Sequence, residues 1–345
     1  MKHLPEEDLQ HVYNHTIDLW EDMRNKSIFI TGGTGFFGIW LLESFLYANA
    51  IKELNAKIIL LTRSCNNFFK RYPHLKKTGG FSLVEGDITN FEFKDFNINF
   101  IIHAASGGTP TLNDNVHGSL VEISIDGTRR MLNYASKCKN VKVLYISSGA
   151  VYGKQPNDIT HLSEDYDGAP DTMKTNSTYG ESKRYCELLS TLYSTQYQFE
   201  IKIARCFTFV GPYLPLQSNY AIGNFIYDVI KNKQIIIKSD GTPRRSYLYA
   251  SDLTIWLWKI LIKGKSLFPY NVGSDIDISI FDLADKIRMI INPACNIKID
   301  KISISKEVER YVPSIKRVFT DINLKPIVSL DEAIKKTVDW YKNME

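Results

Sequence analysis

Residues 27–40 constrain the fold most strongly, because they have the pattern of a buried strand, a glycine-rich turn and a helix. A short apolar run at 28–30 is followed by Gly32, Gly35 and Gly38, and apolar residues then resume at helical spacing. Such a turn lets backbone N–H groups approach a pyrophosphate, and the helix N-terminus adds partial positive charge. The Gly-x-x-Gly-x-x-Gly spacing is weaker than the tighter dinucleotide fingerprint, so a glycine turn without a ligand stays open on this stretch alone.

Apolar runs and helical segments alternate along the first part of the chain. Helical spacing covers residues 6–23 and 116–139, and a third helix carries Tyr179. Further strands are expected at 57–63, 81–85, 99–103, 142–147 and 199–205. This alternation predicts an α/β fold with a doubly wound parallel sheet, in which ligands bind beyond the carboxyl ends of the strands. The glycine turn, Arg63, Asp87, Ala104 and Ser147 all follow such strand ends.

The pattern becomes less regular after the strand at 199–205. Short helices and strands alternate there, and the chain finishes with an amphipathic helix introduced by Ser-Leu-Asp-Glu at 329–332. We therefore expect a helical extension at 1–25, a dinucleotide-binding domain at 26–206 and a smaller α/β lobe at 207–345. The absence of a low-complexity linker indicates that the two larger parts are interwoven.

Charge and cysteine usage exclude several classes of protein. The 42 basic and 38 acidic residues are well mixed, so no charged block marks a nucleic-acid or membrane surface. Five scattered cysteines favour a reducing, cytoplasmic environment over a disulfide framework. Neither a signal peptide nor a membrane span is indicated, and we expect no metal, because His103 and His117 lack ligand partners at useful spacing.

Tyr179 and Lys183 form the most informative chemical pair. Four residues apart on a helix, their side chains share one face. The lysine charge favours the phenolate, so we expect a lowered pKa for Tyr179 and a general base able to take a proton from a secondary alcohol. Ser148, at a strand end, is placed to bond the same substrate oxygen. The alternative interpretation gives these residues no catalytic role: Tyr179 and Lys183 would be a surface pair, and Ser148 an ordinary serine in a turn.

Ordered motifs along the chain resemble the extended short-chain dehydrogenase/reductase family, within its NAD(P)-dependent epimerase/dehydratase branch acting on nucleotide-linked sugars. They are Thr-Gly-Gly-Thr-Gly-Phe-Phe-Gly at 31–38, Gly-Asp at 86–87, His-Ala-Ala at 103–105, Ser-Ser with Val-Tyr-Gly at 147–153, Tyr179 to Lys183, Gly-Pro at 211–212, and Arg-Ser-Tyr-Leu-Tyr at 245–249 followed by Asp252. The resemblance implies a Rossmann-type domain with a substrate-binding C-terminal lobe.

The same resemblance implies the roles of individual residues. Catalysis is assigned to Tyr179, Lys183 and Ser148. The implied cofactor-binding residues are Gly32, Thr34, Gly35, Phe36, Phe37, Gly38, Arg63, Asp87, Ile88, Ala104, Ala105, Ser147, Tyr179 and Lys183. The implied substrate-binding residues are Ser148, Gly149, Tyr179, Thr208, Asn224 and Arg245, with Arg245 reaching the diphosphate or, more plainly, forming a structural ion pair.

Departures from the family pattern narrow the reaction. Gly149 and Ala150 follow Ser148, at positions where dehydratases and decarboxylases of the family are expected to carry acidic residues. Dehydration and decarboxylation are therefore less favoured interpretations. Epimerisation of a nucleotide-diphosphate sugar is the first expectation, although Thr208 stands where 4-epimerases usually carry asparagine. The alternative is an NADPH-dependent 4-keto-sugar-nucleotide reductase, and a non-catalytic NADP-binding scaffold comes last.

Arg63 bears on the cofactor. NAD-preferring relatives usually place an aspartate at the end of the second strand, whereas Thr62-Arg63-Ser64 suits a 2′-phosphate. NADP is therefore favoured slightly over NAD, which also favours the reductase. The alternative interpretation is that Arg63 packs on the adenine ring and does not discriminate between NADP and NAD. The resemblance further implies a homodimer through the helices at 116–139 and 178–195.

Overall fold

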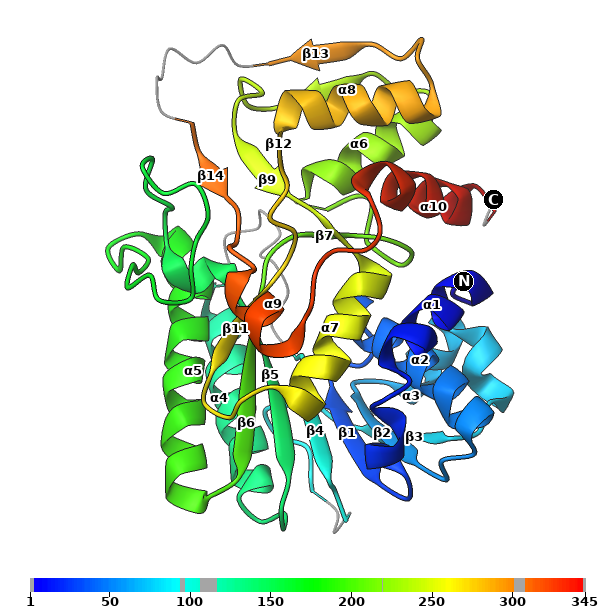
Figure 1. Cartoon of the computed structure of the whole chain (residues 1–345), viewed down its shortest axis with the longest axis vertical. Helices are drawn as coiled ribbons and strands as arrows, with labels where there is room; N and C mark the ends of the chain where they lie inside the picture. The colour runs from blue at the N-terminus through cyan, green and yellow to red at the C-terminus, as the bar shows by residue number, and fades with distance from the viewer. Residues whose placement is uncertain (1–2, 94–96, 106–116, 219, 301–307, 344–345) are drawn as a thin grey trace.

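The central sheet of this computed structural model contains seven parallel strands among the described residues, 3–93, 97–105, 117–218, 220–300 and 308–343 (Figure 1). In spatial order they are β11 (Pro269–Val272), β6 (Glu200–Cys206), β5 (Lys142–Ser148), β4 (Phe100–His103), β1 (Ser27–Thr31), β2 (Lys57–Thr62) and β3 (Phe81–Glu85). The predicted doubly wound α/β fold is confirmed.

The strand order reverses between β1 and β4. From β1 the chain builds outward through β2 and β3, then returns to the other side of β1 with β4, β5 and β6. In register, Thr31 of β1 lies opposite His103 of β4, at the carboxyl ends of both strands. A doubly wound sheet binds its ligand at such a reversal, so the loops after β1 and β4 mark the site.

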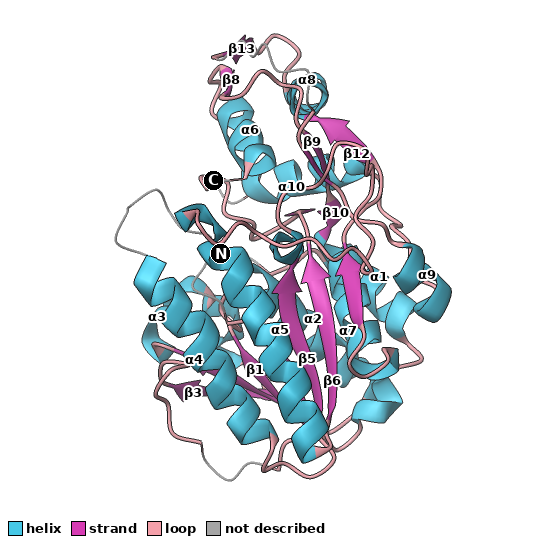
Figure 2. Ribbon diagram, turned by 90° about the vertical axis from the view of Figure 1, so that its left-hand side faces the viewer, coloured by secondary structure: helices cyan, strands magenta, loops and turns pink. Residues whose placement is uncertain are grey.

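Helices cover both faces of the sheet (Figures 1 and 2). On one face, α4 (His117–Ala135) and α5 (Thr178–Tyr197) enclose a core that contains Phe29 of β1. On the other face, α2 (Phe36–Lys52) and α7 (Ala250–Lys263) cover Ile28 and Ile30. Alternate residues of one strand thus enter opposite cores, as strand geometry requires.

The predicted helix at 6–23 is interrupted. It consists of α1 (Glu6–Thr16), which packs on α2 and α7, and a short 3-10 helix η1 (Trp20–Met23). The buried Trp20 ring meets Trp258 of α7 edge-on at 5.4 Å between centroids, so the turn before η1 directs this ring inward. Residue 116, where the next long helix was expected to begin, lies outside the described residues.

Smaller elements connect the larger ones. They are α3 (Cys65–Arg71), β7 (Phe209–Val210), β10 (Leu248–Tyr249) and α9 (Lys316–Ile322), with the 3-10 helices η2 (Pro73–Lys77), η3 (Gly149–Tyr152) and η4 (Thr175–Ser177). Strands β7 and β10 pair in parallel beside the sheet's carboxyl edge. None of the helices in the described part of the chain combines the length and apolar character needed to span a membrane.

A smaller lobe lies beyond that edge, at the top of Figure 1. It contains three helices, α6 (Ala221–Ile230), α8 (Ile280–Ile291) and α10 (Leu330–Lys342), and two small sheets, β12 (Asp277–Ser279)-β9 (Arg244–Ser246)-β14 (Arg310–Tyr311) and β13 (Ile297–Ile299)-β8 (Ile235–Ile237). Yet α7 and β11, from the same part of the sequence, belong to the central layers. The domain boundaries at 25 and 206 stay a prediction.

Candidate active site

The turn after β1 depends on two glycines that allow backbone segments to touch. Gly32 has a positive φ of 70°, and a Cβ added there would lie 2.5 Å from the carbonyl carbon of Ala104. A Cβ on Gly38 would lie 2.3 Å from the Cα of Gly33. Neither neighbour is a flexible side chain, so both positions require glycine for the fold itself.

Gly35 has a different role in the same turn. It is the N-cap residue of α2, no side chain caps this helix, and the nearest atom to an added Cβ is the Gly32 carbonyl oxygen at 3.4 Å. The first-turn N–H groups of α2 therefore lack intrahelical acceptors and carry the positive end of the helix dipole. This arrangement fits the pyrophosphate of a dinucleotide.

The other residues assigned to this loop serve mainly to support it. The Thr34 carbonyl accepts a hydrogen bond from the Tyr72 hydroxyl at 3.0 Å. The Phe36 and Phe37 rings pack together with their centroids 5.7 Å apart, and the Phe37 ring meets Phe209 edge-on with centroids 5.2 Å apart. Phe37 thus links the loop to β7, below the smaller lobe.

Arg63 and Asp87 follow β2 and β3. The Asp87 carboxylate accepts hydrogen bonds from the Thr89 backbone N–H at 3.0 Å and the Thr89 hydroxyl at 2.7 Å. The Thr89 N–H lowers the pKa of Asp87, and the nearby Arg63 charge adds a smaller effect. The Arg63 side chain is exposed and could contact a charged ligand group, whereas the Ile88 side chain is buried in the apolar core.

The loop after β4 is fixed by a buried polar chain. The Thr31 hydroxyl lies 2.7 Å from His103 Nδ1 and accepts a bond from the Ala105 N–H, while the Ala104 N–H donates to the Thr31 carbonyl. His103 Nε2 lies 3.1 Å from the Thr128 hydroxyl. Burial, aided by the Lys183 charge, lowers the pKa of His103 to about 3, so this histidine is neutral and structural.

Three residues assigned to catalysis meet where β5 ends and α5 begins. Ser148 is the last residue of β5, and Tyr179 and Lys183 lie one turn apart on α5. The Ser148 hydroxyl accepts the Ala150 N–H at 3.1 Å. The Lys183 ammonium donates to the Ile146 carbonyl at 2.8 Å and lies 6.0 Å from the centre of the Tyr179 ring.

The expected lowering of the Tyr179 pKa is wrong for the protein groups alone. Burial raises the pKa of Tyr179 above its ordinary value, and a hydrogen bond from Ser148 only partly offsets this effect. Burial also lowers the pKa of Lys183 to about 8, so its ammonium predominates at pH 7. The chain by itself therefore keeps Tyr179 protonated, because the loss of hydration on burial disfavours the phenolate.

A buried ion pair beneath this site was not predicted from the sequence. Glu187, one turn after Lys183 on α5, accepts the Ser147 hydroxyl and two donor nitrogens of Arg205, at 2.7 Å for Nη2. Arg205 also donates to the Tyr152 hydroxyl at 2.9 Å, and Tyr152 donates to Asn271 of β11 at 2.7 Å. These bonds tie β5, α5, β6 and β11 together.

Tyr311 of the smaller lobe is a second residue that sequence reasoning missed. A Cβ on Gly149 would lie 2.7 Å from the Tyr311 hydroxyl oxygen, so this phenol reaches the residue after Ser148. Burial raises the pKa of Tyr311, and a hydrogen bond between Tyr311 and the Ser148 hydroxyl opposes that shift. Strand β14 places Tyr311 opposite Arg245 of β9. Its only sequence signal was a weakly matching stretch.

The substrate residues assigned from the resemblance are engaged within the protein. Thr208 donates to the Ser246 carbonyl, and Asn224 donates to the Ser218 carbonyl at 2.7 Å. Arg245 forms an ion pair with Glu309 and donates to the Arg244 carbonyl at 2.9 Å. Each of these three side chains is thus engaged by another group of the protein, and no hydrogen bond or ion pair joins them to one another in the described part of the chain.

The sequence of this chain is similar to those of known proteins. A protein-family model described as "NAD dependent epimerase/dehydratase family" matches residues 28–273. The chain is 28% identical over 305 residues to UDP-glucuronic acid decarboxylase 6 of Arabidopsis thaliana, with 85% of each protein covered. It is 24% identical over 329 residues to dTDP-D-glucose 4,6-dehydratase of Mus musculus, covering 92% of this chain and 89% of the relative.

Solved structures show the same fold. UDP-glucuronic acid 4-epimerase from Bacillus cereus, solved with UDP-glucuronic acid and NAD, matches with a TM-score of 0.77 at 24% identity, covering 92% of this chain and 100% of that one. The dTDP-glucose 4,6-dehydratase from Bacillus anthracis, in complex with NAD, matches with a TM-score of 0.76 at 19% identity, covering 93% and 97%.

The two kinds of glycine in the loop predict opposite mutant phenotypes. Gly38→Ala forces Cβ into the Gly33 backbone and should destabilise the protein by roughly 2–3 kcal/mol. Gly35→Ala meets ordinary contacts and should cost less than about 1 kcal/mol, while weakening dinucleotide binding at the helix end. Urea unfolding and cofactor titration measure these two effects. Equal unfolding midpoints for the two variants would contradict the assignment.

Proposed function

The chain belongs to the NAD dependent epimerase/dehydratase family, and from this premise we propose that it transfers a hydride at a ring carbon of a nucleotide-activated sugar in order to epimerise that carbon. The observation that carries the proposal is the convergence of Ser148, Tyr179 and Lys183 beside Gly149, which supplies no acid or base.

The names of the relatives suggest the substrate class. Their names give UDP-glucuronic acid or dTDP-glucose as substrate, and the names of the epimerase and the dehydratase specify carbon 4 and carbons 4 and 6, respectively. We therefore propose a pyrimidine-nucleotide hexose or hexuronic acid as substrate, with carbon 4 as the reacting centre. Arg245 would bind the diphosphate after exchanging its ion pair with Glu309, since a guanidinium fork suits phosphate oxygens.

The proposed chemistry divides between a cofactor and the chain. When bound at the glycine loop, NAD(P) supplies a hydride acceptor and, in its oxidised form, a positive charge. As the phenolate, which the positive charge of the oxidised cofactor together with Lys183 would favour, Tyr179 would accept the proton of the sugar hydroxyl and return it after the sugar has presented its other face. Ser148 holds the reacting oxygen by a hydrogen bond. Lys183, fixed by the Ile146 carbonyl, favours the phenolate during that transfer.

The space beside Gly149 argues against dehydration and decarboxylation. A Cβ there would meet Phe207 Cζ and the Tyr311 hydroxyl, both at 2.7 Å, so an acid at this position would require these two rings to move. Ala150, the next residue, has no ionisable group. Proton abstraction at a second carbon has no carboxylate in this segment to perform it. Tyr311 would instead offer a second hydroxyl to the sugar.

A keto-sugar reductase is the second candidate, and Arg63 is the observation that favours it. This arginine is exposed at the end of β2, where a 2′-phosphate of NADP would be bound. The Ser64 hydroxyl already accepts the Asn67 N–H as the cap of α3, so Arg63 carries the NADP preference without it. The similar solved structures contain NAD, so a preference for NADP is a proposal for this chain alone.

Turnover of sugar nucleotides tests the proposed epimerase. A thermal-shift screen of UDP- and dTDP-sugars identifies a ligand, because binding to the native state raises its apparent stability. The purified protein should then interconvert two epimers without added cofactor. Stoichiometric NADPH consumption with a 4-keto sugar would support the reductase instead, and absence of any turnover would support a scaffold.

The variant Tyr179→Phe should lower kcat by about 10²–10⁴-fold, because it removes the proposed acid/base. Tyr193→Phe is the matched control, since Tyr193 lies on the same helix and donates to Asn133. That control should keep wild-type activity. Equal activity of the two variants would remove Tyr179 from the mechanism.

The cofactor preference has its own test. Arg63→Asp replaces the cation with a carboxylate that repels a 2′-phosphate and can accept ribose hydroxyls, so the ratio of NADP to NAD affinity should fall at least about tenfold. Fluorescence titration of both cofactors measures the ratio. Lys70→Asp, an exposed charge reversal on α3, is the control for general electrostatics. An unchanged ratio in Arg63→Asp would exclude a 2′-phosphate contact.

The homodimer proposed from the resemblance finds support on α5. Tyr185, Leu188 and Leu192 recur at helical spacing and leave 42%, 54% and 54% of their surfaces exposed. Helix α4 packs beside α5, so the two helices can offer one apolar surface. Leu188→Asp should convert a dimer into a monomer in sedimentation velocity, with Lys70→Asp, an exposed position on α3 outside both helices, as a control. A monomeric wild-type protein would contradict the proposal.

A further inference from the structure

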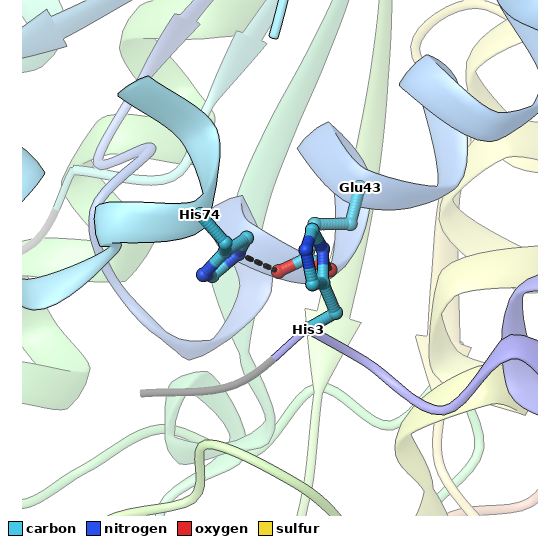
Figure 3. Close-up of side chains that lie close together, drawn as sticks. All are labelled: His3, Glu43 and His74. Atoms are coloured by element: carbon cyan, nitrogen blue, oxygen red, sulfur yellow. Dashed lines mark hydrogen bonds and ion pairs between the residues drawn. The ribbon is translucent and has the colours of Figure 1, made fainter. Parts of the chain in front are cut away.

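Two histidines and a buried glutamate meet away from the candidate active site, where the N-terminal segment crosses α2 (Figure 3). His3 comes from that segment, Glu43 from α2 and His74 from η2. One ligand atom from each lies within 4.8 Å of the others. The Glu43 and His74 side chains are only 3% and 8% exposed, whereas His3 is 65% exposed.

The Glu43 carboxylate is buried and has three close polar neighbours. Its Oε1 accepts the Tyr213 hydroxyl at 2.8 Å and lies 3.1 Å from His74 Nε2. Its Oε2 accepts the Leu4 backbone N–H at 2.9 Å. A buried carboxylate ordinarily pairs with a positive charge or coordinates a metal. The bonds from Tyr213 and Leu4 are of the kind that orient a ligating carboxylate from outside.

Neither histidine completes a hydrogen-bonded arrangement of its own. His3 Nδ1 lies 4.0 Å from Glu43 Oε2, beyond hydrogen-bonding distance. The buried His74 Nδ1 has no hydrogen-bond partner within the described part of the chain. The two rings contact each other at 4.1 Å between centroids, tilted by 53°. Both histidine rings thus lie close to the Glu43 carboxylate, and each keeps a ring nitrogen that makes no hydrogen bond to it.

We propose that His3, Glu43 and His74 bind a divalent transition-metal ion, with Zn²⁺ as the best match to the donor set. Ligands about 2.0–2.1 Å from zinc in a tetrahedral arrangement lie about 3.3 Å apart. The His74–Glu43 separation already meets this requirement, and rotation of the exposed His3 side chain closes the remaining gap. A water molecule on the solvent side completes four-fold coordination, as in other sites with three protein ligands.

Such an ion would fasten a junction between distant parts of the chain. The His3 carbonyl accepts the Trp340 indole N–H of α10 at 3.2 Å, and Tyr213, bonded to Glu43, belongs to the turn that follows β7. Helix α2 begins at the cofactor loop. The ion therefore links the N-terminal segment to the helix that carries this loop, and stabilises the contact with α10.

Metal titration of the untagged full-length protein tests the proposal. After EDTA treatment, ZnCl₂ should bind one ion per chain with micromolar or tighter affinity in calorimetry, and should raise Tm. Co²⁺, as a spectroscopic substitute, should give the visible absorption of a four-coordinate nitrogen and oxygen site. No binding below millimolar Zn²⁺ would overturn the proposal, whatever the outcome of the turnover experiments.

A pair of histidine variants identifies the ligands. His3→Ala should fold normally, because its side chain is largely exposed, yet weaken Zn²⁺ affinity at least about tenfold and abolish the Tm shift. His161→Ala removes a histidine bonded to the Asp275 carbonyl and should leave both unchanged. If His3→Ala binds Zn²⁺ as the wild type does, the proposed ligand set is wrong.

Discussion

The close backbone contact between Gly32 and Ala104 is the constraint on which the rest of the site depends. It occurs where the strand order reverses, between β1 and β4, and it requires a residue without Cβ at position 32. Because the turn is held there, α2 begins directly above the sheet with its N-terminus uncapped by any side chain. Thr31 and His103 fix the same two strand ends by hydrogen bonds.

The catalytic residues are supported from below by a buried ionic network. The Glu187 carboxylate accepts hydrogen bonds from Ser147 of β5 and Arg205 of β6. Arg205 also donates to the Tyr152 hydroxyl, which in turn donates to Asn271 of β11. Loss of one partner of such a pair typically costs about 3–5 kcal/mol, because the other charge stays buried. The network therefore serves position more than net stability: it holds the end of β5 and the start of α5 in a fixed relation, which a proton transfer needs.

Local patterns predicted most of the central fold. The strand ends at Thr31 and His103 follow directly from apolar runs that stop at polar residues, whereas the strand expected at 57–63 ends one residue earlier, at Thr62. The spacing of Tyr179 and Lys183 predicted their shared helix face. Longer-range features were invisible. Tyr311 reaches Gly149 from a part of the chain with little regular pattern, the cluster of His3, Glu43 and His74 spans three separate segments, and the raised pKa of Tyr179 results from burial that only the folded chain creates.

In the proposed reaction, hydride leaves one carbon of a nucleotide sugar and returns to the same carbon, while Tyr179 moves the proton. The most direct measurement follows deuterium placed on carbon 4 of the sugar nucleotide that the protein turns over. For epimerisation, the product should keep the deuterium on carbon 4, with unchanged mass and no exchange with solvent. Deuterium found on carbon 6 with loss of water, or a product that has lost carbon dioxide, would contradict it.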